Sequence, residues 1–207
     1  MWTVIGRQLR HPSGIAGSLI GYLMGAFNRE SNRAAIEALH LAPGDTILEL
    51  GSGPGRALKM VAAISPKGCV LGIDHSTTML AQAGRHNRSA VRDGRVCLLC
   101  ARFEALPCRA DSIDKILAVH VIYFADAETI REARRVLRPG GRIVVLVTDR
   151  HALQNCKFAK TETHRLFDRN DLTSLLIAGG FAKDTISVST ITLGFGIPVL
   201  IGVATKS

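Results

Sequence analysis

Aromatic side chains are scarce in this chain: they make up 5% of its 207 residues, with one tryptophan and two tyrosines. Proteins that bind single-stranded nucleic acid use aromatic rings on which successive bases stack. Ten aromatic residues spread over the whole chain offer few such platforms. We therefore do not expect nucleic acid to be a partner.

Long hydrophobic runs are also absent. The most apolar stretch, residues 14–27, is rich in glycine and interrupted by polar residues, and it is shorter than the roughly 20 apolar residues that a transmembrane helix needs. Arg7 and Arg10 precede it, but no convincing small-residue cleavage site follows, as a secretory signal would require. We expect neither a transmembrane segment nor a signal peptide.

Cysteines are few, at positions 69, 97, 100, 108 and 156. A core of this size needs no disulfide framework, so free thiols indicate a reducing compartment, and we expect a cytoplasmic protein. Cys97 and Cys100 have the spacing of half a zinc site, but no second pair of close ligands follows. They fall in an expected strand, where residues three apart point to opposite faces. We interpret both as buried core residues and expect no metal.

Acidic residues number 17 against 26 basic ones, which gives a net charge of +9. Arginines concentrate in residues 85–109 and 131–150. Such a surface attracts anionic partners, although an excess of charge is most often only a solvated surface. An anionic lipid or an acidic substrate stays open as an interpretation.

A glycine-rich segment, Glu49-Leu50-Gly51-Ser52-Gly53-Pro54-Gly55-Arg56, is the most informative feature that is present. An apolar, β-branched run precedes it and a helical apolar spacing follows from Arg56 to Ile64, so a strand should end and a helix begin there. Glycines suit a tight turn whose backbone a ligand approaches, and exposed amides at a helix N-terminus favour electron-rich groups. A tight turn with no ligand would need glycines too.

The spacing of these glycines separates two families. A dinucleotide-binding loop has Gly-x-Gly-x-x-Gly, and its third glycine would fall on Arg56 or Lys59. The observed Gly-x-Gly-x-Gly after an acidic residue resembles the first motif of class I S-adenosylmethionine (SAM) dependent methyltransferases. The resemblance implies SAM as cofactor, with the loop around its amino-acid and ribose parts. The residues that it assigns to this loop are Glu49, Gly51, Ser52, Gly53 and Gly55.

A second checkpoint follows about twenty residues later, at Cys69-Val70-Leu71-Gly72-Ile73-Asp74. A carboxylate at the end of the second strand accepts two hydrogen bonds and so suits a ribose diol. The segment from Asp74 to Met79 is similar to the Asp-x-Ser-x-x-Met of the family. The resemblance assigns Asp74 to the ribose, places His75 against the adenine and adds Met79 to the cofactor site.

A third checkpoint, Ala101-Arg102-Phe103-Glu104-Ala105-Leu106-Pro107, resembles the segment of the family that faces adenine. The family often has an aspartate where Arg102 stands, and arginine has no acceptor for the exocyclic amine. We place Arg102 and Phe103 at the cofactor, with adenine recognition by the backbone around Phe103.

Further landmarks extend the resemblance over residues 45–205. Arg135-Val136-Leu137-Arg138-Pro139-Gly140-Gly141, expected as a turn before a strand from Arg142 to Thr148, is characteristic of the small-molecule branch that contains the quinone C-methyltransferases. An expected helix from Leu172 to Gly180 and a last strand from Val199 to Thr205 follow. The implied fold is α/β: a Rossmann-like, doubly wound, seven-stranded sheet, mostly parallel with an antiparallel last strand and helices on both faces.

The chain is long enough for one domain. We expect residues 41–207 to form the SAM-binding core and residues 1–40 to be a helical lid of the same domain. Residues 8–14 with Met24 and Asn28 resemble the N-terminal segment of an uncharacterised bacterial subgroup of these methyltransferases. That subgroup has asparagine where His120 stands. A helix packed on the sheet edge and an interfacial anchor for a lipid substrate are the alternatives.

Methyl transfer from SAM needs positioning of the acceptor more than it needs an acid or a base. Where a base helps, His120 is our first candidate, and Tyr123 in the same loop could orient the acceptor. A purely structural role for His120 stays equally open. His164 is a later candidate, and Cys156 is of interest because arsenite methyltransferases resemble this branch.

The expected reaction is therefore methyl transfer to a small-molecule or lipid-like acceptor by in-line displacement. Three alternatives stay open: a catalytically silent SAM-binding protein, an RNA methyltransferase suggested by the net charge, and an aminopropyl transferase, for which the loop offers only Asp126 and Glu128. The chain lacks the Asn/Asp-Pro-Pro-aromatic motif of base N-methyltransferases. Acceptor identity, the methylated atom and oligomeric state do not follow from the sequence.

Overall fold

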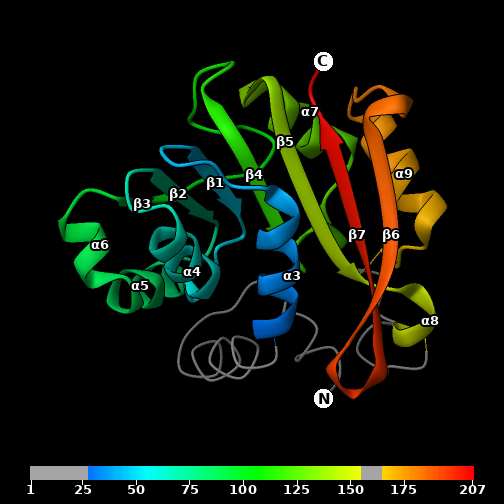
Figure 1. Ribbon diagram of the computed structural model, residues 1–207, viewed down its shortest axis with the longest axis horizontal. Coiled ribbons are helices and arrows are strands. Elements are labelled where there is room, and N and C mark those ends of the chain that lie inside the picture. The colour runs from blue at the N-terminus through cyan, green and yellow to red at the C-terminus, as the bar shows by residue number, and fades with distance from the viewer. Residues whose placement is uncertain (1–27, 155–164) are drawn as a thin grey trace.

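The computed structural model describes residues 28–154 and 165–207. Seven strands form one sheet in the order β3-β2-β1-β4-β5-β7-β6 (Figure 1). The strands are β1 (Thr46–Leu50), β2 (Cys69–Asp74), β3 (Val96–Cys100), β4 (Ile113–Val119), β5 (Leu137–Thr148), β6 (Ile186–Leu193) and β7 (Ile197–Thr205). Strands β1 to β5 are parallel, and β7 runs antiparallel to both β5 and β6. The predicted sheet is confirmed.

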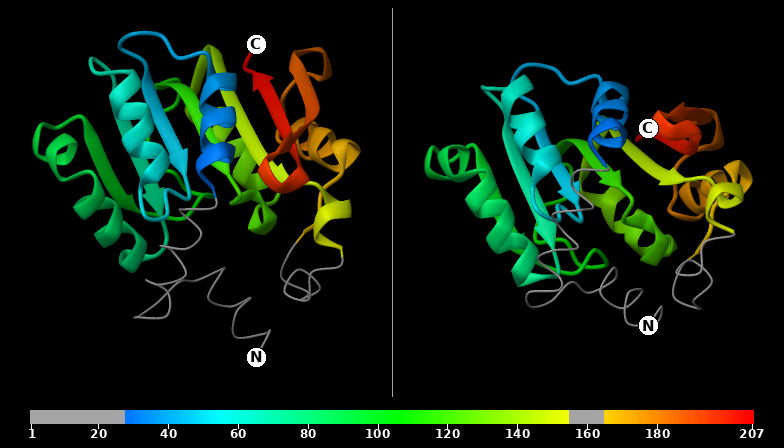
Figure 2. Two further views of the ribbon diagram at one scale, coloured as in Figure 1. Left: turned by 60° about the horizontal axis from the view of Figure 1, so that its bottom comes forward. Right: turned by 90° about the horizontal axis from the view of Figure 1, so that it is seen from below.

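Helices cover both faces of this sheet. Residues Arg29–Leu39 form α3, Arg56–Ile64 form α4 and Thr77–His86 form α5, and their apolar sides belong to one buried cluster. The other face carries α7 (Ala127–Val136) and α9 (Arg169–Ala178). Figure 2 shows α3 and α7 on opposite sides of the sheet. The short helices are α6 (Arg88–Arg92), α8 (Arg150–Leu153), η1 (Ile122–Phe124), η2 (Lys183–Thr185) and η3 (Gly194–Gly196).

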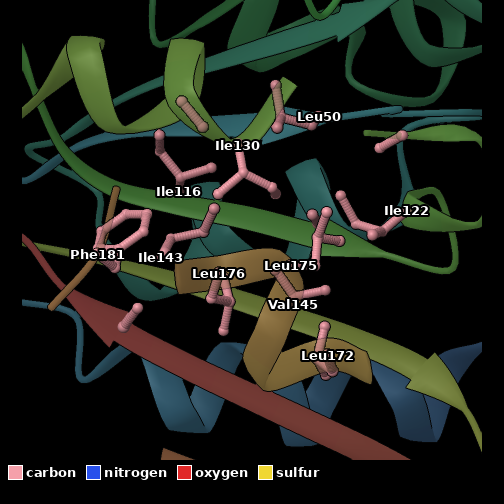
Figure 3. Close-up of a cluster of buried hydrophobic side chains, with 14 of the residues drawn as sticks. Leu50, Ile116, Ile122, Ile130, Ile143, Val145, Leu172, Leu175, Leu176 and Phe181 are labelled. Carbon is pink, nitrogen blue, oxygen red and sulfur yellow. The ribbon is translucent and has the colours of Figure 1, made fainter. Parts of the chain in front are cut away.

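The cluster under α7 and α9 joins the two helices to the middle of the sheet. Ile130 of α7 and Leu172 and Leu176 of α9 are fully buried against Ile116 and Val145 of the central strands (Figure 3). Burial of one such side chain contributes roughly 1.5–3 kcal/mol. This packing fixes the strand ends from which the loops of the site emerge.

Among the element boundaries that differ from the expected ones, the starts of β5 and α9 have a clear structural cause. Strand β5 begins at Leu137, not Arg142, because Leu137 pairs with Ile113 and the register then shifts before Lys115 pairs with Arg142. The segment expected to be a turn thus lies within an irregular strand. Helix α9 begins at Arg169 because Asp168 caps it in a reciprocal capping box with Asp171.

The expectation that Cys97 and Cys100 are buried is wrong, because both are exposed. They lie on β3, which is the edge strand and pairs only with β2. In residues 28–154 and 165–207, no group of three or more side chains could hold a metal ion. No helix in the same ranges is long and apolar enough to cross a membrane. The apolar stretch at residues 14–27 lies outside the described residues.

Candidate functional site

Three loops meet at the carboxyl ends of β1, β2 and β4, where open parallel sheets bind their ligands. Residues 51–55 follow β1, His75 and Ser76 follow β2, and residues 120–125 follow β4. These strands are neighbours in the sheet. The structure therefore brings the glycine loop, the acidic strand end and the proposed acceptor loop to one place.

The three loop glycines have different physical reasons to be there. All three have positive φ, which side chains other than glycine adopt at a cost. A Cβ on Gly51 would lie 2.4 Å from Val121 Cγ2, and one on Gly55 would lie 2.6 Å from Asn87 Nδ2. A Cβ on Gly53 would meet nothing within 4 Å. Two glycines permit close packing, while the third leaves open space beside the backbone.

The loop amides are used inside the protein. Gly51 and Ser52 donate to the Ile73 carbonyl at 2.8 and 3.0 Å, Gly53 donates to Asp74 Oδ2 at 2.9 Å, and Gly55 donates to the Ser52 carbonyl at 2.9 Å. These four amides, which precede the first residue of α4, are therefore not available to a ligand. What the loop presents to a ligand is open space and side-chain oxygens.

Glu49 is buried at the end of β1 and accepts a hydrogen bond from the backbone of Leu58 in the first turn of α4. That contact suits a carboxylate, because the positive end of the helix dipole lies there. Desolvation and the nearby Asp74 raise the pKa of Glu49 well above its usual value. Within the part of the chain that the structure describes, its Oε2 atom has no hydrogen-bond partner, and neither does the buried Oγ of Ser52. Buried polar atoms without partners are rare and point to a missing donor.

Asp74 connects the loops that follow β1 and β2. Its Oδ2 accepts from the Gly53 amide at 2.9 Å and its Oδ1 accepts from the Ser76 amide at 2.8 Å. Ser76 then caps α5 by accepting from the Met79 amide at 3.3 Å. Each carboxylate oxygen can accept a second hydrogen bond, so Asp74 can hold a diol while it holds the loop.

The structure gives the four residues expected at the adenine end different surroundings. The rings of His75 and Phe103 meet edge to face with centroids 6.5 Å apart, and Met79 is buried. The side chain of Arg102 is 82% exposed and lies 3.3 Å from Glu104 Oε2. The Arg102 side chain is therefore not brought together with the other predicted cofactor residues.

His120 and Tyr123 belong to one hydrogen-bonded chain. His120 Nδ1 lies 3.1 Å from Tyr123 Oη, and Tyr123 Oη accepts from the Thr148 amide at 2.7 Å. His120 Nε2 lies 3.0 Å from the Oγ of the buried Ser31 on α3. In the simplest proton assignment, Tyr123 donates to Nδ1 and the Nε2 proton of His120 goes to Ser31.

Desolvation governs the charge of both acceptor-loop side chains. It lowers the pKa of His120 to about 4 and raises the pKa of Tyr123 to about 12. Both are therefore neutral at pH 7. His120 also has a φ of 55°, a left-handed conformation in which asparagine and histidine are enriched. Asparagine would tolerate the same backbone conformation at this position.

Two residues of the site were missed by sequence reasoning. Ser31 gives no signal in the sequence, because its contact with His120 spans 89 positions. Asn87 is buried, and its Nδ2 donates at 2.9 Å to the carbonyls of both Gly55 and Ala83. Nothing in the sequence indicated that this residue, which directly follows α5, contacts the glycine loop. His164 and Cys156 lie outside the described residues.

Comparison with known proteins gives consistent results. Residues 47–141 match the family described as a methyltransferase domain. An uncharacterized methyltransferase of Bacillus subtilis, YdaC, is 30% identical over 163 residues, which cover 78% of this chain and 85% of that protein. A ubiquinone/menaquinone biosynthesis C-methyltransferase of Syntrophotalea carbinolica is 36% identical over 121 residues, 58% of this chain and 50% of that protein.

The fold has close structural counterparts. A putative methyltransferase of Haloferax volcanii, solved with the Trm112 activator, superposes with a TM-score of 0.79 over 90% of this chain and 93% of that one, at 18% identity. Among relatives found by sequence, an uncharacterized protein from a transposon of Streptomyces fradiae is 33% identical over 176 residues. These residues cover 84% of this chain and 50% of that protein. Together, the family match, the relative from Bacillus and the arrangement of the site show that the chain belongs to the class I SAM-dependent methyltransferases.

Proposed function

We propose that the protein transfers a methyl group from SAM to a small-molecule or lipid-like acceptor by in-line displacement. The observation that carries this proposal is the contact between the two loops that the reaction needs. Gly51 of the cofactor loop packs so closely on Val121 of the acceptor loop that a Cβ would lie 2.4 Å from Val121 Cγ2. A cofactor on one loop and an acceptor on the other would therefore be neighbours.

The residues of the site fit SAM. The unpartnered Oε2 of Glu49 can accept from an α-ammonium group, and the open space at Gly53 accommodates the ligand beside the backbone. Asp74 can accept from ribose hydroxyls, and His75 and Phe103 supply rings at the adenine end. SAM supplies a methyl group already activated on its sulfonium.

His120 and Tyr123 are the proposed acceptor-side residues. The low pKa of His120 keeps its imidazole neutral above about pH 5, but also makes it a weak base. Both of its nitrogens already have partners. We propose that the pair holds and orients the acceptor, and that positioning supplies most of the rate enhancement.

Names of relatives support the proposed acceptor class. They include the quinone C-methyltransferase already described, a 24-methylenesterol C-methyltransferase of rice and a malonyl-[acyl-carrier protein] O-methyltransferase of Methylococcus capsulatus. We propose that the N-terminal segment, residues 1–40, forms a lid over this acceptor site, with α3 as the part of it that lies in the described residues. Contact of that segment with a membrane surface and a cytoplasmic location stay predictions.

The test is a calorimetric titration with SAM and, separately, with NAD. We expect micromolar binding of SAM, no binding of NAD, and at least a hundredfold loss of SAM affinity in Asp74→Ala. A circular dichroism spectrum of this variant checks that the fold is intact. Binding of NAD in place of SAM would overturn the proposal.

A screen of acceptors with methyl-labelled SAM separates catalysis from silent binding. Methyl transfer to a quinone, a sterol-like lipid or a small acid is the expected outcome. SAM binding without turnover of any of them would favour the silent SAM-binding alternative. Turnover of RNA would instead favour the RNA methyltransferase.

A further inference from the structure

Arg165 is an arginine beside the proposed acceptor loop that the roles assigned so far do not use. Its amide donates to the Tyr123 carbonyl at 3.1 Å, so its backbone runs along the loop that carries His120 and Tyr123. Two residues later, Phe167 forms a β-bridge with Asp149 at the end of β5 and is fully buried. The chain at Arg165 is thus held on both sides by the carboxyl edge of the sheet.

Among the described residues, the guanidinium of Arg165 has two weak contacts. Its Nη1 lies 3.5 Å from the Ala125 carbonyl, and its Cζ lies 5.5 Å from the centroid of the Phe167 ring. No carboxylate in residues 28–154 and 165–207 forms an ion pair with it, and the residue is exposed. The ring steadies the planar cation, while most of its N–H donors stay available to a ligand.

Arg150, on the same edge of the sheet, shows the opposite pattern. Its guanidinium pairs with Asp168 at 3.2 Å and also with Asp171, which are the two residues of the α9 capping box. Its charge is therefore neutralised inside the fold. Asp126, next to Ala125, directs its carboxylate to the Glu128 and Thr129 amides at the start of α7. Within the described residues, the positive charge of Arg165 thus has no carboxylate counterpart near the acceptor loop.

We propose that Arg165 binds an anionic group of the acceptor, a carboxylate or a phosphate. Arginine presents a planar fork that matches both groups with two parallel hydrogen bonds. Here the fork is anchored through its own backbone to the loop of the acceptor-side residues. This inference rests on the proposed function and narrows its acceptor class to acids and phosphate esters.

The test measures probe binding to the protein saturated with S-adenosylhomocysteine. The anionic probes are benzoate and phenyl phosphate, and benzamide is the neutral counterpart. We expect the wild type to bind at least one anion at least tenfold more tightly than benzamide. Arg165→Gln should remove that preference and leave benzamide binding unchanged. The benzoate and phenyl phosphate arms tell whether the group recognised is a carboxylate or a phosphate.

A matched control is Arg92→Gln. Arg92 is likewise exposed, with 78% of its side chain accessible, but it lies on α6 at the opposite end of the sheet from α9 (Figure 1). The Arg92→Gln variant should bind the anions like the wild type, and this result would separate a local site at Arg165 from a general effect of net charge. Arg165→Lys keeps the charge without the fork and should retain only part of the preference.

Equal anion binding by the wild type and Arg165→Gln would overturn this inference, as would a wild type that binds anions no better than benzamide. Binding of S-adenosylhomocysteine, measured first, separates a failure of the proposed function from a failure of the Arg165 proposal. If S-adenosylhomocysteine binds and the protein shows no preference for the anions over benzamide, only the role of Arg165 fails. If it does not bind, the proposed function itself fails.

Discussion

His120 Nε2, on the loop after β4, lies 3.0 Å from Ser31 Oγ on α3, although the two residues are 89 positions apart. The other ring nitrogen of His120 engages Tyr123. The contact joins a helix on one face of the sheet to the acceptor loop at its carboxyl edge. The orientation of the His120 ring therefore depends on the position of α3, which lies within the proposed lid segment.

Replacement of His120 distinguishes a positioning residue from a base. We expect His120→Asn to keep at least a tenth of wild-type turnover with an acceptor from the screen, because asparagine tolerates the left-handed backbone and still hydrogen-bonds. His120→Ala should lose more activity and about 1–2 kcal/mol of stability, because alanine is strained there. If His120 were the base, both variants would be equally inactive and the wild-type rate would fall with an ionisation near pH 4.

Acid should destabilise the protein through His120. The folded-state pKa of about 4 lies below the ordinary value of 6.5, so the unfolded chain takes up the proton first. The stabilisation is fully present above about pH 6.5 and is lost as the pH falls to about 4. It amounts to roughly 3 kcal/mol at most. Urea unfolding at several pH values should show this decline in the wild type, and the decline should be smaller by that amount in His120→Asn.

Alanine at Gly51 should mainly affect stability, whereas alanine at Gly53 should mainly affect SAM binding. Gly51→Ala meets Val121 and should destabilise the fold by several kcal/mol. Gly53→Ala meets nothing within 4 Å, so it should cost only the left-handed strain of about 1–2 kcal/mol. SAM should nevertheless bind at least tenfold more weakly to Gly53→Ala, because the methyl group takes ligand space. Thermal unfolding and calorimetry check the two expectations, and unchanged SAM affinity in Gly53→Ala would place the ligand elsewhere.

Glu49→Gln should weaken the binding of SAM and raise the stability of the fold at neutral pH. The pKa of Glu49 is raised in the folded state, so its contribution to stability is full below its unfolded pKa and is lost as the pH rises toward the raised value. The variant should therefore melt at a higher temperature than the wild type at neutral pH. It should bind SAM about ten- to a hundredfold more weakly, because a charge-assisted hydrogen bond contributes about 1.5–3 kcal/mol.

The pH dependence of SAM affinity provides a control for the Glu49→Gln variant. Affinity of the wild type for SAM should rise with pH as Glu49 ionises, since a cationic ammonium prefers the carboxylate. The affinity of Glu49→Gln should lack this rise. A wild-type affinity independent of pH, together with unchanged binding in the variant, would remove Glu49 from the cofactor site.

The local features of the site are largely contained in the sequence. An apolar run that stops at glycines determines where β1 ends and α4 begins, and the predicted bounds of α4, Arg56 to Ile64, agree with the structure. Asp74 at the end of β2 follows in the same way from the hydrophobic pattern. These predictions succeed because each depends on residues adjacent along the chain, where backbone geometry and burial impose a short period.

What the sequence did not determine depends on contacts between distant elements. The exposure of Cys97 and Cys100 follows from the edge position of β3, and a strand pattern does not state which strand lies at an edge. The contact of His120 with Ser31 on α3 and the position of Arg165 beside Tyr123 likewise arise between elements that only the fold brings together. The sequence by itself thus determined the family, the strand ends and the cofactor loop. The tertiary structure decided which side chains are neutral, buried or free to bind, because desolvation and hydrogen bonding depend on what packs against each group in space.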